Sequence, residues 1–238
     1  MKKVLLQLDT DQHPSPFDAS VAQDAGVDVL LSHGGVTPEA VQGLVQGAFF
    51  TRAPDDLSSM AVWVGGSDVS AGEKILDEVQ AAYFGPFRIS AMHDSDGCNT
   101  TAATAIALIA KDRDLSGRRA VIIGVGPVGL RSATLLREEG CDVLAAGPAG
   151  VEVLPEAVWS GNLTLELLAD YNAAEPLGIE GVKSGDDLVE RHGKLVLGAL
   201  AVGGAKMKTH KACVRRLFER NDLILDADGV YAVAQEIV

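Results

Sequence analysis

Aromatic residues and basic charges are both scarce in this chain of 238 residues. Aromatic side chains make up 5% of the sequence, and 20 lysines and arginines stand against 33 aspartates and glutamates, which leaves a net charge of −13. A surface of that sign repels nucleic acid and anionic membranes. We therefore expect no nucleic acid and no membrane among the partners.

Cysteine and long apolar runs are also scarce. The three cysteines (Cys98, Cys141 and Cys213) are odd in number and far apart, which argues against a disulfide framework and against a zinc site. No apolar run is long enough to span a bilayer, and Asp9 interrupts the first one well before the length of a signal peptide. The sequence predicts a cytoplasmic protein without a metal site.

Short apolar stretches instead alternate with helical patterns, and this alternation is typical of an α/β protein with a parallel sheet covered by helices. The chain also has 26 glycines, which suit tight turns between strands and helices. In the first half the expected strands are 3–8, 27–31, 60–66 and 87–92, and the expected helices are 15–26, 37–47, 72–85 and 100–112.

A polar stretch at 112–118, DRDLSGR, predicts a domain junction. We expect an N-terminal α/β domain at 1–113 and a second, dinucleotide-binding domain at 114–202. Two helices in 203–238 are expected to pack back on the first domain. In the second half the expected strands are 118–123, 141–146, 165–172 and 194–200, and the expected helices are 128–140, 204–220 and 226–238.

The stretch VIIGVGPVGL at 121–130 contains Gly124, Gly126 and Gly129 in the spacing of a dinucleotide-binding turn. In such a turn one glycine permits the tight bend, one lets the backbone approach the pyrophosphate, and one lets helix and strand pack closely. The pyrophosphate then lies at the positive end of the helix. A glycine turn kept only for close packing is the alternative, since the motif alone is a weak signal.

The residues after the next strand leave that alternative open. A dinucleotide site has an acid there for the ribose, or an arginine for the 2′-phosphate of NADP. The strand CDVLAA at 141–146 is followed by GPAG, and Asp142 lies at its beginning, the wrong end for the cofactor. The sequence therefore shows no residue that would recognise the adenosine.

Two lysines, Lys206 and Lys208, are expected in or near the first turn of a helix that begins around Gly203 and Gly204. A cation at a helix N-terminus opposes the helix dipole. A lysine in that position is a candidate acid, base or polarising group. The alternative is that both side chains reach into solvent. His210 fits packing or solvation better than chemistry.

Two polar clusters follow expected strands, at the sheet edge where open α/β sheets bind ligands. Their acids, amides and hydroxyls suit a polar heterocycle with many N–H donors, such as a pterin, and also Mg²⁺, although no metal-binding spacing is present. The alternative for the second cluster is capping of the helix at 100–112. The clusters comprise Asp9, Thr10, Asp11, Phe17 and Asp18, and Asp94, Ser95, Asp96, Asn99, Thr100 and Thr101.

Several stretches, in the same order and over nearly the whole chain, resemble the bacterial NADP-dependent methylene-tetrahydromethanopterin dehydrogenases. They are LDTDQHPSPFD, FGPFRISAMHDSDGCNTTAA, GVGPVGLRSA, ADYNAAEPLGI and GALAVGGAKMKTHKACVRRLFE. The resemblance implies an enzyme of one-carbon metabolism that oxidises the methylene bridge of a tetrahydropterin carrier and passes a hydride to NADP. It also implies a pterin-binding α/β domain, a Rossmann-like domain, a cleft between them and a homo-oligomer.

The resemblance also assigns roles to single residues. Lys206 matches the lysine that family members place beside the reacting carbon. The residues implied on the pterin side are Asp9, Asp11, Phe17, Asp18, Asn99, Thr100 and Thr101. Gly124, Gly126, Pro127, Val128 and Gly129 are implied as the phosphate turn, and Asp170 and Asn172 at the nicotinamide end.

The chain departs from the family after residue 147. Family members continue there with an arginine-bearing turn and a further helix and strand, whereas GPAG here runs directly into VEVLPEAVW. About forty residues are missing by this comparison, the size of one β-α-β unit. We expect a shortened Rossmann-like domain in which NADP, or NAD, is held mainly by its pyrophosphate and nicotinamide.

Two other functions fit the same residues. One is a pterin-binding paralogue that has lost nucleotide binding and serves as a carrier, sensor or subunit. The other is a pterin reductase that uses a different hydride donor, for example a flavin. Lys206 and the phosphate turn favour catalysis, because a carrier needs neither. The carrier itself, tetrahydromethanopterin or tetrahydrofolate, is not distinguished by the sequence.

Overall fold

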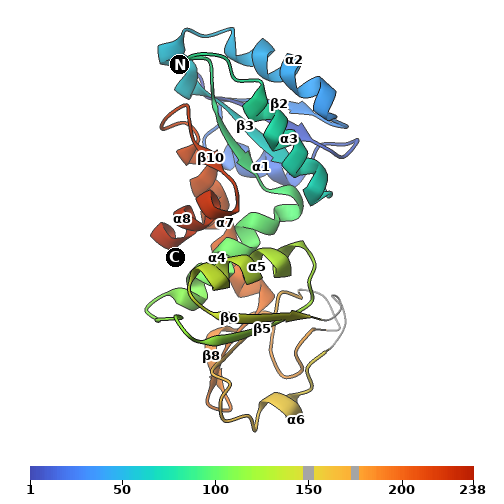
Figure 1. Cartoon of the computed structure of the whole chain (residues 1–238), viewed down its shortest axis with the longest axis vertical. Helices are drawn as coiled ribbons and strands as arrows, with labels where there is room; N and C mark the ends of the chain where they lie inside the picture. The colour runs from blue at the N-terminus through green and yellow to red at the C-terminus, as the bar shows by residue number, and fades with distance from the viewer. Residues whose placement is uncertain (147–152, 173–176) are drawn as a thin grey trace.

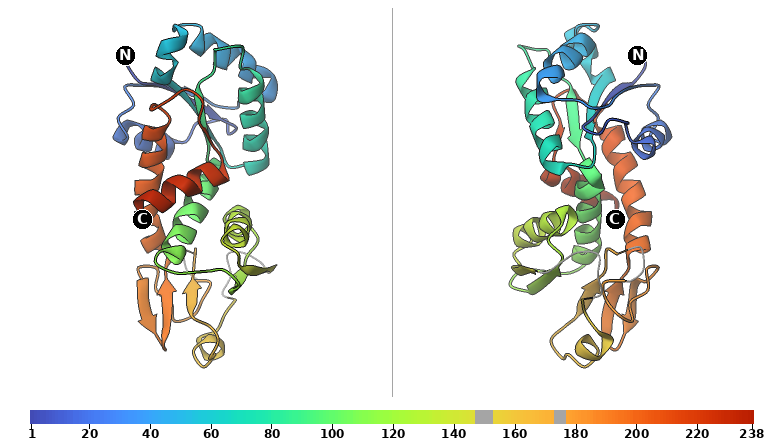
Figure 2. Two further views of the ribbon diagram at one scale, coloured as in Figure 1. Left: turned by 60° about the vertical axis from the view of Figure 1, so that its left-hand side comes forward. Right: turned by 90° about the vertical axis from the view of Figure 1, so that its right-hand side faces the viewer.

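The structure is a computed structural model of the chain and describes residues 1–146, 153–172 and 177–238. The molecule is elongated, with a large sheet at one end, two small sheets at the other and a group of helices between them (Figure 1). Helices α4 and α7 run along the long axis and connect the two ends (Figure 2).

The large sheet has five parallel strands in the order β10-β4-β3-β1-β2. Apolar residues at nearly every position explain why β1 and β3 are buried on both faces. The register places Asp9 opposite Gly65 and Val64 opposite His93, so that the carboxyl ends of three strands meet at one edge. The strands are β1 (Val4–Asp9), β2 (Val29–His33), β3 (Met60–Gly65), β4 (Ser90–His93) and β10 (Ile224–Leu225).

Helices cover both faces of this sheet. One core includes Val62 and Ile75 and lies under α2 and α3, and the other includes Trp63 and Met92 and lies under α1, α4, α7 and α8. Helix α1 begins after Ser15, whose hydroxyl accepts the Asp18 backbone N–H at 3.2 Å. These helices are α1 (Pro16–Asp24), α2 (Pro38–Phe49), α3 (Val69–Ala81), α4 (Cys98–Ala110), α7 (Ala199–Arg216) and α8 (Ala227–Ile237), with 3-10 turns at Pro54–Ser59 and Ser95–Gly97.

The second end of the molecule contains one β-α-β unit. Strands β5 (Arg119–Ile123) and β6 (Asp142–Ala146) are parallel and are connected by α5 (Pro127–Glu138). Helix α5 packs on α4, and its Leu135 and Leu136 join the core of the large sheet. The other face of the strand pair carries exposed apolar side chains.

A separate sheet of three strands follows, in the order β7-β9-β8, with β7 parallel and β8 antiparallel to β9. The elements are α6 (Glu156–Trp159), β7 (Leu167–Ala169), β8 (Asp187–Arg191) and β9 (Lys194–Leu197). The sequence predicted no strand over 187–191, the range of β8. It forms by pairing with β9 across a tight turn, with a bulge and a positive φ at Leu188.

The structure confirms the predicted α/β class with a parallel sheet. The second half differs from one continuous Rossmann-like sheet, since β5-β6 and β7-β9-β8 are distinct. Among the described residues, no helix has both the length and the apolar character needed to cross a membrane.

Candidate functional site

The polar residues that follow β1, β3 and β4 lie at the carboxyl edge of the large sheet. Two glycines at the end of β3 allow the loop after β1 to come close. A Cβ on Gly66, which has a φ of 110°, would lie 2.0 Å from Oγ1 of Thr10, and one on Gly65 would lie 3.0 Å from Oδ2 of Asp18. Position 66 therefore requires glycine for this edge to form, whereas a side chain at position 65 would crowd the Asp18 carboxylate.

Asp9 and Asp11 hold this edge together. The Asp9 carboxylate is buried, and its oxygens accept the backbone N–H groups of Asp11 and Ser15, each at 2.9 Å. Asp11 accepts from the backbone N–H and the hydroxyl of Ser67, at 3.0 and 2.8 Å. The resemblance assigns Asp9 and Asp11 to the pterin, and in the structure both carboxylates hold the loops after β1 and β3 in place by hydrogen bonds.

Asp18 lies in the first turn of α1 and is less tightly held. Burial raises the pKa of its carboxyl group from 3.8 to about 7, and the negative charges of Asp94 and Asp9 add to the rise. The positive charge of Lys206 and a hydrogen bond with Ser15 act in the opposite direction. Asp18 therefore changes charge near neutral pH.

The residues after β4 cap helix α4. Asp94 is buried and accepts the Thr100 backbone N–H at 2.9 Å and the Thr100 hydroxyl at 2.6 Å. The Asn99 amide donates to the His93 carbonyl at 2.7 Å, and the Thr101 hydroxyl donates to the Gly97 carbonyl at 2.6 Å. Asn99 and Thr100 are buried and Thr101 is half-buried. Capping thus accounts for the bond between Asp94 and the Thr100 backbone N–H, whereas Asn99 and Thr101 donate to backbone carbonyls before and at the start of the helix.

Lys206 reaches the same edge from α7. A Cβ on Gly97 would lie 2.3 Å from its Nζ, so the lysine occupies the space that the glycine leaves. The Nζ also lies 5.8 Å from the centre of the Phe17 ring, which is 49% exposed. Asp9, Phe17, Asp18 and Lys206 are thereby brought together.

The helix-dipole argument for Lys206 is wrong. Helix α7 begins at Ala199, after the N-cap Gly198, so Lys206 and Lys208 lie about two turns inside it. Gly203 and Gly204 are tolerated within the helix, where we expected them to begin it. At this start, Gly198 packs against the backbone of the preceding loop, where a Cβ would lie 2.2 Å from the Lys183 carbonyl oxygen, and the Leu200 backbone N–H donates to the Ser184 carbonyl at 2.7 Å.

His210 is buried beside the predicted site residues, in agreement with the packing predicted for it. It lies one turn after Lys206, is 1% exposed, and its ring centroid lies 4.6 Å from that of Trp63, with the two rings tilted. Burial lowers its pKa to about 4, although the Asp94 carboxylate opposes the shift, so the ring is neutral at physiological pH. Its spacing of four residues from Lys206 places both side chains on one helix face. The sequence did not predict its contacts with Trp63 and Asp94.

The His210 ring lies close to Asp94 without a well-formed hydrogen bond. Its Nε2 is 3.3 Å from Oδ2 of Asp94, but the angles do not suit a hydrogen bond, and neither ring nitrogen has a hydrogen-bond partner among the described residues. The buried polar group beneath Lys206 and Phe17 therefore consists of Asp94, Thr100 and His210.

The glycine turn lies at the carboxyl end of β5. Gly124 has a φ of 99°, which favours glycine, and a Cβ on Gly129 would lie 2.0 Å from the Gly124 carbonyl oxygen. Gly126 is the N-cap of α5, and nothing lies within 4 Å of the place where its Cβ would be. Pro127 follows at the first helical position, and Val128 is half-buried.

These three environments match the three duties of a dinucleotide turn: a bend at Gly124, an open approach at Gly126 and close packing at Gly129. The residues present thus fit a pyrophosphate at the N-terminus of α5. The predicted lack of an adenosine-binding residue concerns residues 147–150 and lies outside the described residues.

Asp170 and Asn172 follow β7. Asp170 is buried, and its oxygens accept the backbone N–H groups of Asn172 at 2.9 Å and Ile179 at 3.0 Å. It therefore closes the loop after β7. Tyr171, between them, shares a hydrogen bond of 3.1 Å with Ser132 of α5, which ties this loop to the helix of the glycine turn.

An ion pair between Arg131 of α5 and Glu73 of α3 joins the two sides of the molecule. It connects the helix of the glycine turn with a helix that covers the large sheet.

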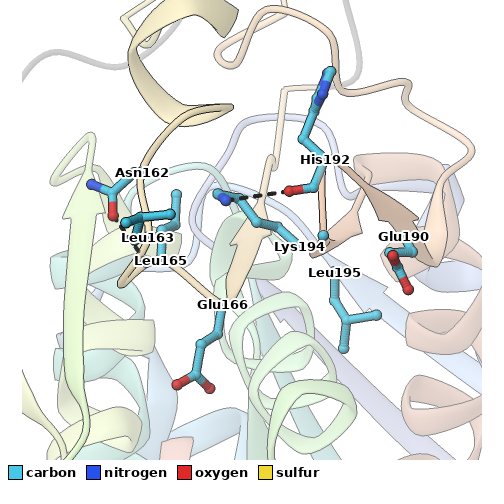
Figure 3. Close-up of a pocket in the computed structure, with 9 residues that line it drawn as sticks. Asn162, Leu163, Leu165, Glu166, Glu190, His192, Lys194 and Leu195 are labelled. Carbon is cyan, nitrogen blue, oxygen red and sulfur yellow. Dashed lines mark hydrogen bonds between the residues drawn. The ribbon is translucent and has the colours of Figure 1, made fainter.

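A further hollow, of about 370 Å³, lies at the amino ends of β7 and β9 (Figure 3). Its central cation is the buried Lys194, whose Nζ donates to the His192 carbonyl at 3.4 Å. Glu166 and Glu190 also line the hollow, so its charge does not favour an anionic ligand. None of the predicted site residues line it. Within the described residues, no group of three or more His, Cys, Asp or Glu side chains could hold a metal ion.

The chain is similar in sequence to one family profile and to two relatives from one organism. The family profile described as "Methylene-tetrahydromethanopterin dehydrogenase, N-terminal" matches residues 16–96. "Bifunctional protein MdtA" of Methylorubrum extorquens is 38% identical over 285 aligned positions, which cover 99% of both chains. "NAD(P)-dependent methylenetetrahydromethanopterin dehydrogenase" of the same organism is 28% identical, again over 99% of both.

The alignment with the first relative spans 285 positions, at least 47 more than the 238 residues of this chain. That relative therefore has residues without a counterpart here. Among solved structures, a FolD methylenetetrahydrofolate dehydrogenase/cyclohydrolase from Campylobacter jejuni matches with 13% identity and a TM-score of 0.48, covering 100% of this chain and 90% of its own.

Proposed function

Because the chain belongs to the methylene-tetrahydromethanopterin dehydrogenase family, we propose that it transfers a hydride between the methylene group of a tetrahydropterin C1 carrier and NADP. The carrier is methylene-tetrahydromethanopterin or methylene-tetrahydrofolate, and NAD is the second acceptor to test. One observation carries the proposal. The Lys206 ammonium lies beside the exposed Phe17 ring at the carboxyl edge of the large sheet. It occupies the space where a side chain at position 97 would lie if Gly97 were another residue.

Phe17 and Lys206 suit the reacting part of a pterin. The exposed Phe17 ring offers a flat apolar surface for a heterocycle, and the Nζ 5.8 Å from its centre offers hydrogen-bond donors beside that surface. Lys206 would hold the ring that carries the methylene group in one orientation. Asp18, in the same turn of α1 as Phe17, would complete this side.

The glycine turn suits the nucleotide. The open position at Gly126 lets backbone N–H groups at the start of α5 bind a pyrophosphate. When bound, NADP supplies the carbon that accepts or returns the hydride. Hydride transfer needs no nucleophile, so the protein's contribution is to hold the two rings against each other in a fixed geometry. The Arg131–Glu73 ion pair would help to fix that geometry.

A pterin-binding protein without nucleotide chemistry is the second candidate. The 47 or more residues of the first relative that have no counterpart here favour this candidate, because a shorter chain has less surface with which to bind a cofactor. The exposed apolar face of β5 and β6, with Val121 at 66% and Leu144 at 64%, also fits a reduced nucleotide domain.

The two candidates differ in turnover and in nucleotide binding. The protein is mixed with each methylene carrier and with NADP or NAD, and formation of reduced nicotinamide is followed by absorbance. Turnover supports the dehydrogenase. Thermal stabilisation by a carrier, with no turnover and no stabilisation by either nucleotide, would support the second candidate instead.

The first prediction concerns Lys206. Replacing it in Lys206→Ala removes the polar group beside the reacting ring, and we expect kcat/KM to fall by about 100-fold or more, as for other groups that orient or stabilise the transition state. Lys208→Ala is the matched control, since Lys208 is exposed on the same helix. Equal activity in both variants would overturn the role given to Lys206.

We also propose that the enzyme is cytoplasmic and homo-oligomeric, with domains at 1–113 and 114–202 and with 203–238 packed on the first. The three cysteines are free thiols, which fits a reducing compartment. The apolar face of β5 and β6 offers an area for a subunit contact. Light scattering measures the molar mass and so tests the homo-oligomer. Limited proteolysis tests the domain boundary, because cleavage is expected within 112–118.

A further inference from the structure

Asp18 lies close enough to Lys206 and to two other carboxylates, Asp9 and Asp94, for their charges to act on it, and the three carboxylates differ in how their oxygens are occupied. Asp9 and Asp94 are almost completely buried, and each accepts two hydrogen bonds, from backbone N–H groups or from the Thr100 hydroxyl. The Asp18 side chain is half-buried, and Ser15 is its one hydrogen-bond partner within the described residues. Asp18 is therefore the carboxylate of this group that retains capacity to face a ligand.

The reaction proposed above creates a positive charge at this edge. The methylene bridge is neutral; its C–H bond breaks, both electrons leave with the hydride to NADP, and the methenyl carrier keeps one positive charge. The Lys206 ammonium opposes a second cation nearby. A negative group beside Phe17 and Lys206 would offset that repulsion.

We propose that the Asp18 carboxylate is the counter-charge of the cationic methenyl carrier. This inference rests on the proposed function and deepens it, because it assigns Asp18 to one oxidation state of the carrier. The first turn of α1 places Asp18 next to Phe17, whose ring faces Lys206. Gly65 leaves room for the carboxylate, since a Cβ there would lie 3.0 Å from Oδ2.

Asp18 changes charge in the neutral range because burial and two neighbouring carboxylates raise its pKa to about 7. The charged or titratable groups that act on it are Asp9 after β1, Asp94 after β4 and Lys206 on α7. His210, beneath them on α7, has a pKa of about 4 and stays neutral throughout this range. Among Asp18 and the groups that act on it, the Asp18 carboxyl group is thus the one expected to lose its proton as the pH rises through 7.

The pH dependence of binding follows with a definite sign. The cationic methenyl form binds the ionised site best, so its affinity rises with pH, whereas the neutral methylene form is nearly indifferent. A ligand that binds only the ionised form gains about tenfold in affinity between roughly pH 6 and pH 8, because the ionised fraction rises from about 0.1 to about 0.9. Binding of the methenyl form should also release a proton.

The test measures the dissociation constants of methenyl- and methylene-tetrahydromethanopterin, and of the two tetrahydrofolate forms, by calorimetry without nucleotide at both pH values. Samples are mixed just before each reading. Asp18→Asn should weaken binding of the methenyl form about tenfold at the higher pH, abolish its pH dependence and change the methylene affinity less than about twofold. Asp18→Glu should restore the pH dependence.

Asp24→Asn is the matched control, because Asp24 lies at the end of the same helix and pairs with Lys211 at 2.8 Å. Equal pH dependence for both carrier forms in the unmodified enzyme would overturn the inference without any variant. So would an Asp18→Asn variant that keeps the preference for the methenyl form at high pH. If no carrier form binds at all, the proposed function fails first.

Discussion

The polar edge of the large sheet and the glycine turn after β5 are built in different ways. At the large sheet, helices cover both faces, and the polar edge is assembled from β1, β3, α1, α4 and α7. At β5 and β6, one helix covers one face, and Val121 and Leu144 on the other face are exposed. The glycine turn nevertheless keeps the geometry expected of it. A phosphate turn is thus a local structure, whereas the edge around Lys206 depends on the whole fold.

The largest expected effect would come from breaking the local turn. A Cβ in Gly129→Ala would lie 2.0 Å from the Gly124 carbonyl oxygen, so α5 must shift away from β5. We expect NADP affinity to fall by about 10–100-fold and Tm to drop, since overpacking of this kind costs about 1–3 kcal/mol. Carrier affinity should change less, because the polar edge of the large sheet is formed by residues of β1, β3, α1, α4 and α7 and not by α5.

Gly126→Ala separates binding from folding at the same turn. Open space surrounds the position of its Cβ, so Tm should stay within about 1 °C, because surface substitutions of this kind change stability by less than about 0.5 kcal/mol. NADP affinity should still fall, since the added methyl group occupies the approach of the pyrophosphate. Unchanged affinity would mean that the turn serves packing and not nucleotide binding.

A smaller effect, on the free energy of unfolding, should distinguish the large sheet from the β5-β6 pair. Val62 on β3 is fully buried, whereas Val121 on β5 is 66% exposed. Val62→Thr places a hydroxyl in an apolar core and should lower the free energy of unfolding by about 1–3 kcal/mol. Val121→Thr should change it by less than about 0.5 kcal/mol. Urea denaturation measures both, and a large loss for Val121→Thr would show that another subunit covers this face.

The smallest effect tests the contact between Gly97 and Lys206. In Gly97→Ala the new Cβ would lie 2.3 Å from Nζ, so the flexible lysine must move away from the Phe17 ring. We expect kcat to fall by about fivefold to tenfold, because a misplaced orienting group loses part of its effect.

Gly85→Ala is the control for backbone strain. Gly85 also has a positive φ, 53° against 60° for Gly97, and nothing lies within 4 Å of its Cβ position. Both variants should lose about 1–2 kcal/mol of stability from the left-handed backbone, and only Gly97→Ala should lose activity. An equal loss of activity in both variants would show that the contact between Gly97 and Lys206 does not contribute to activity.

The sequence predicted best what short stretches determine alone. The apolar stretches became β1, β3 and β4, the Ser15-Pro16 start became the N-terminus of α1, and the glycine spacing became a turn before α5. Each depends on neighbours within a few residues, where turn and capping rules apply.

What the sequence could not predict depends on contacts between distant segments. Strand β8 forms only against β9, although its own residues suit a loop. Helix α7 begins at Ala199, where Gly198 and the Leu200 backbone N–H meet the loop before β8. The buried approach of His210 to Asp94 joins residues more than a hundred positions apart. None of these contacts leaves a periodic or local pattern in the sequence.

The late position of α7 in the chain also bears on synthesis. A ribosome delivers the first four strands of the large sheet well before α7, β10 and α8. Until then, the side of β4 that pairs with β10 is open, and the core around Trp63 and Met92 lacks two of its covering helices. Such exposed surface favours association with chaperones or with other nascent chains. Lys206 is delivered with α7, before β10 and α8, so the polar edge around it can assemble before the large sheet gains its last strand and its last covering helix.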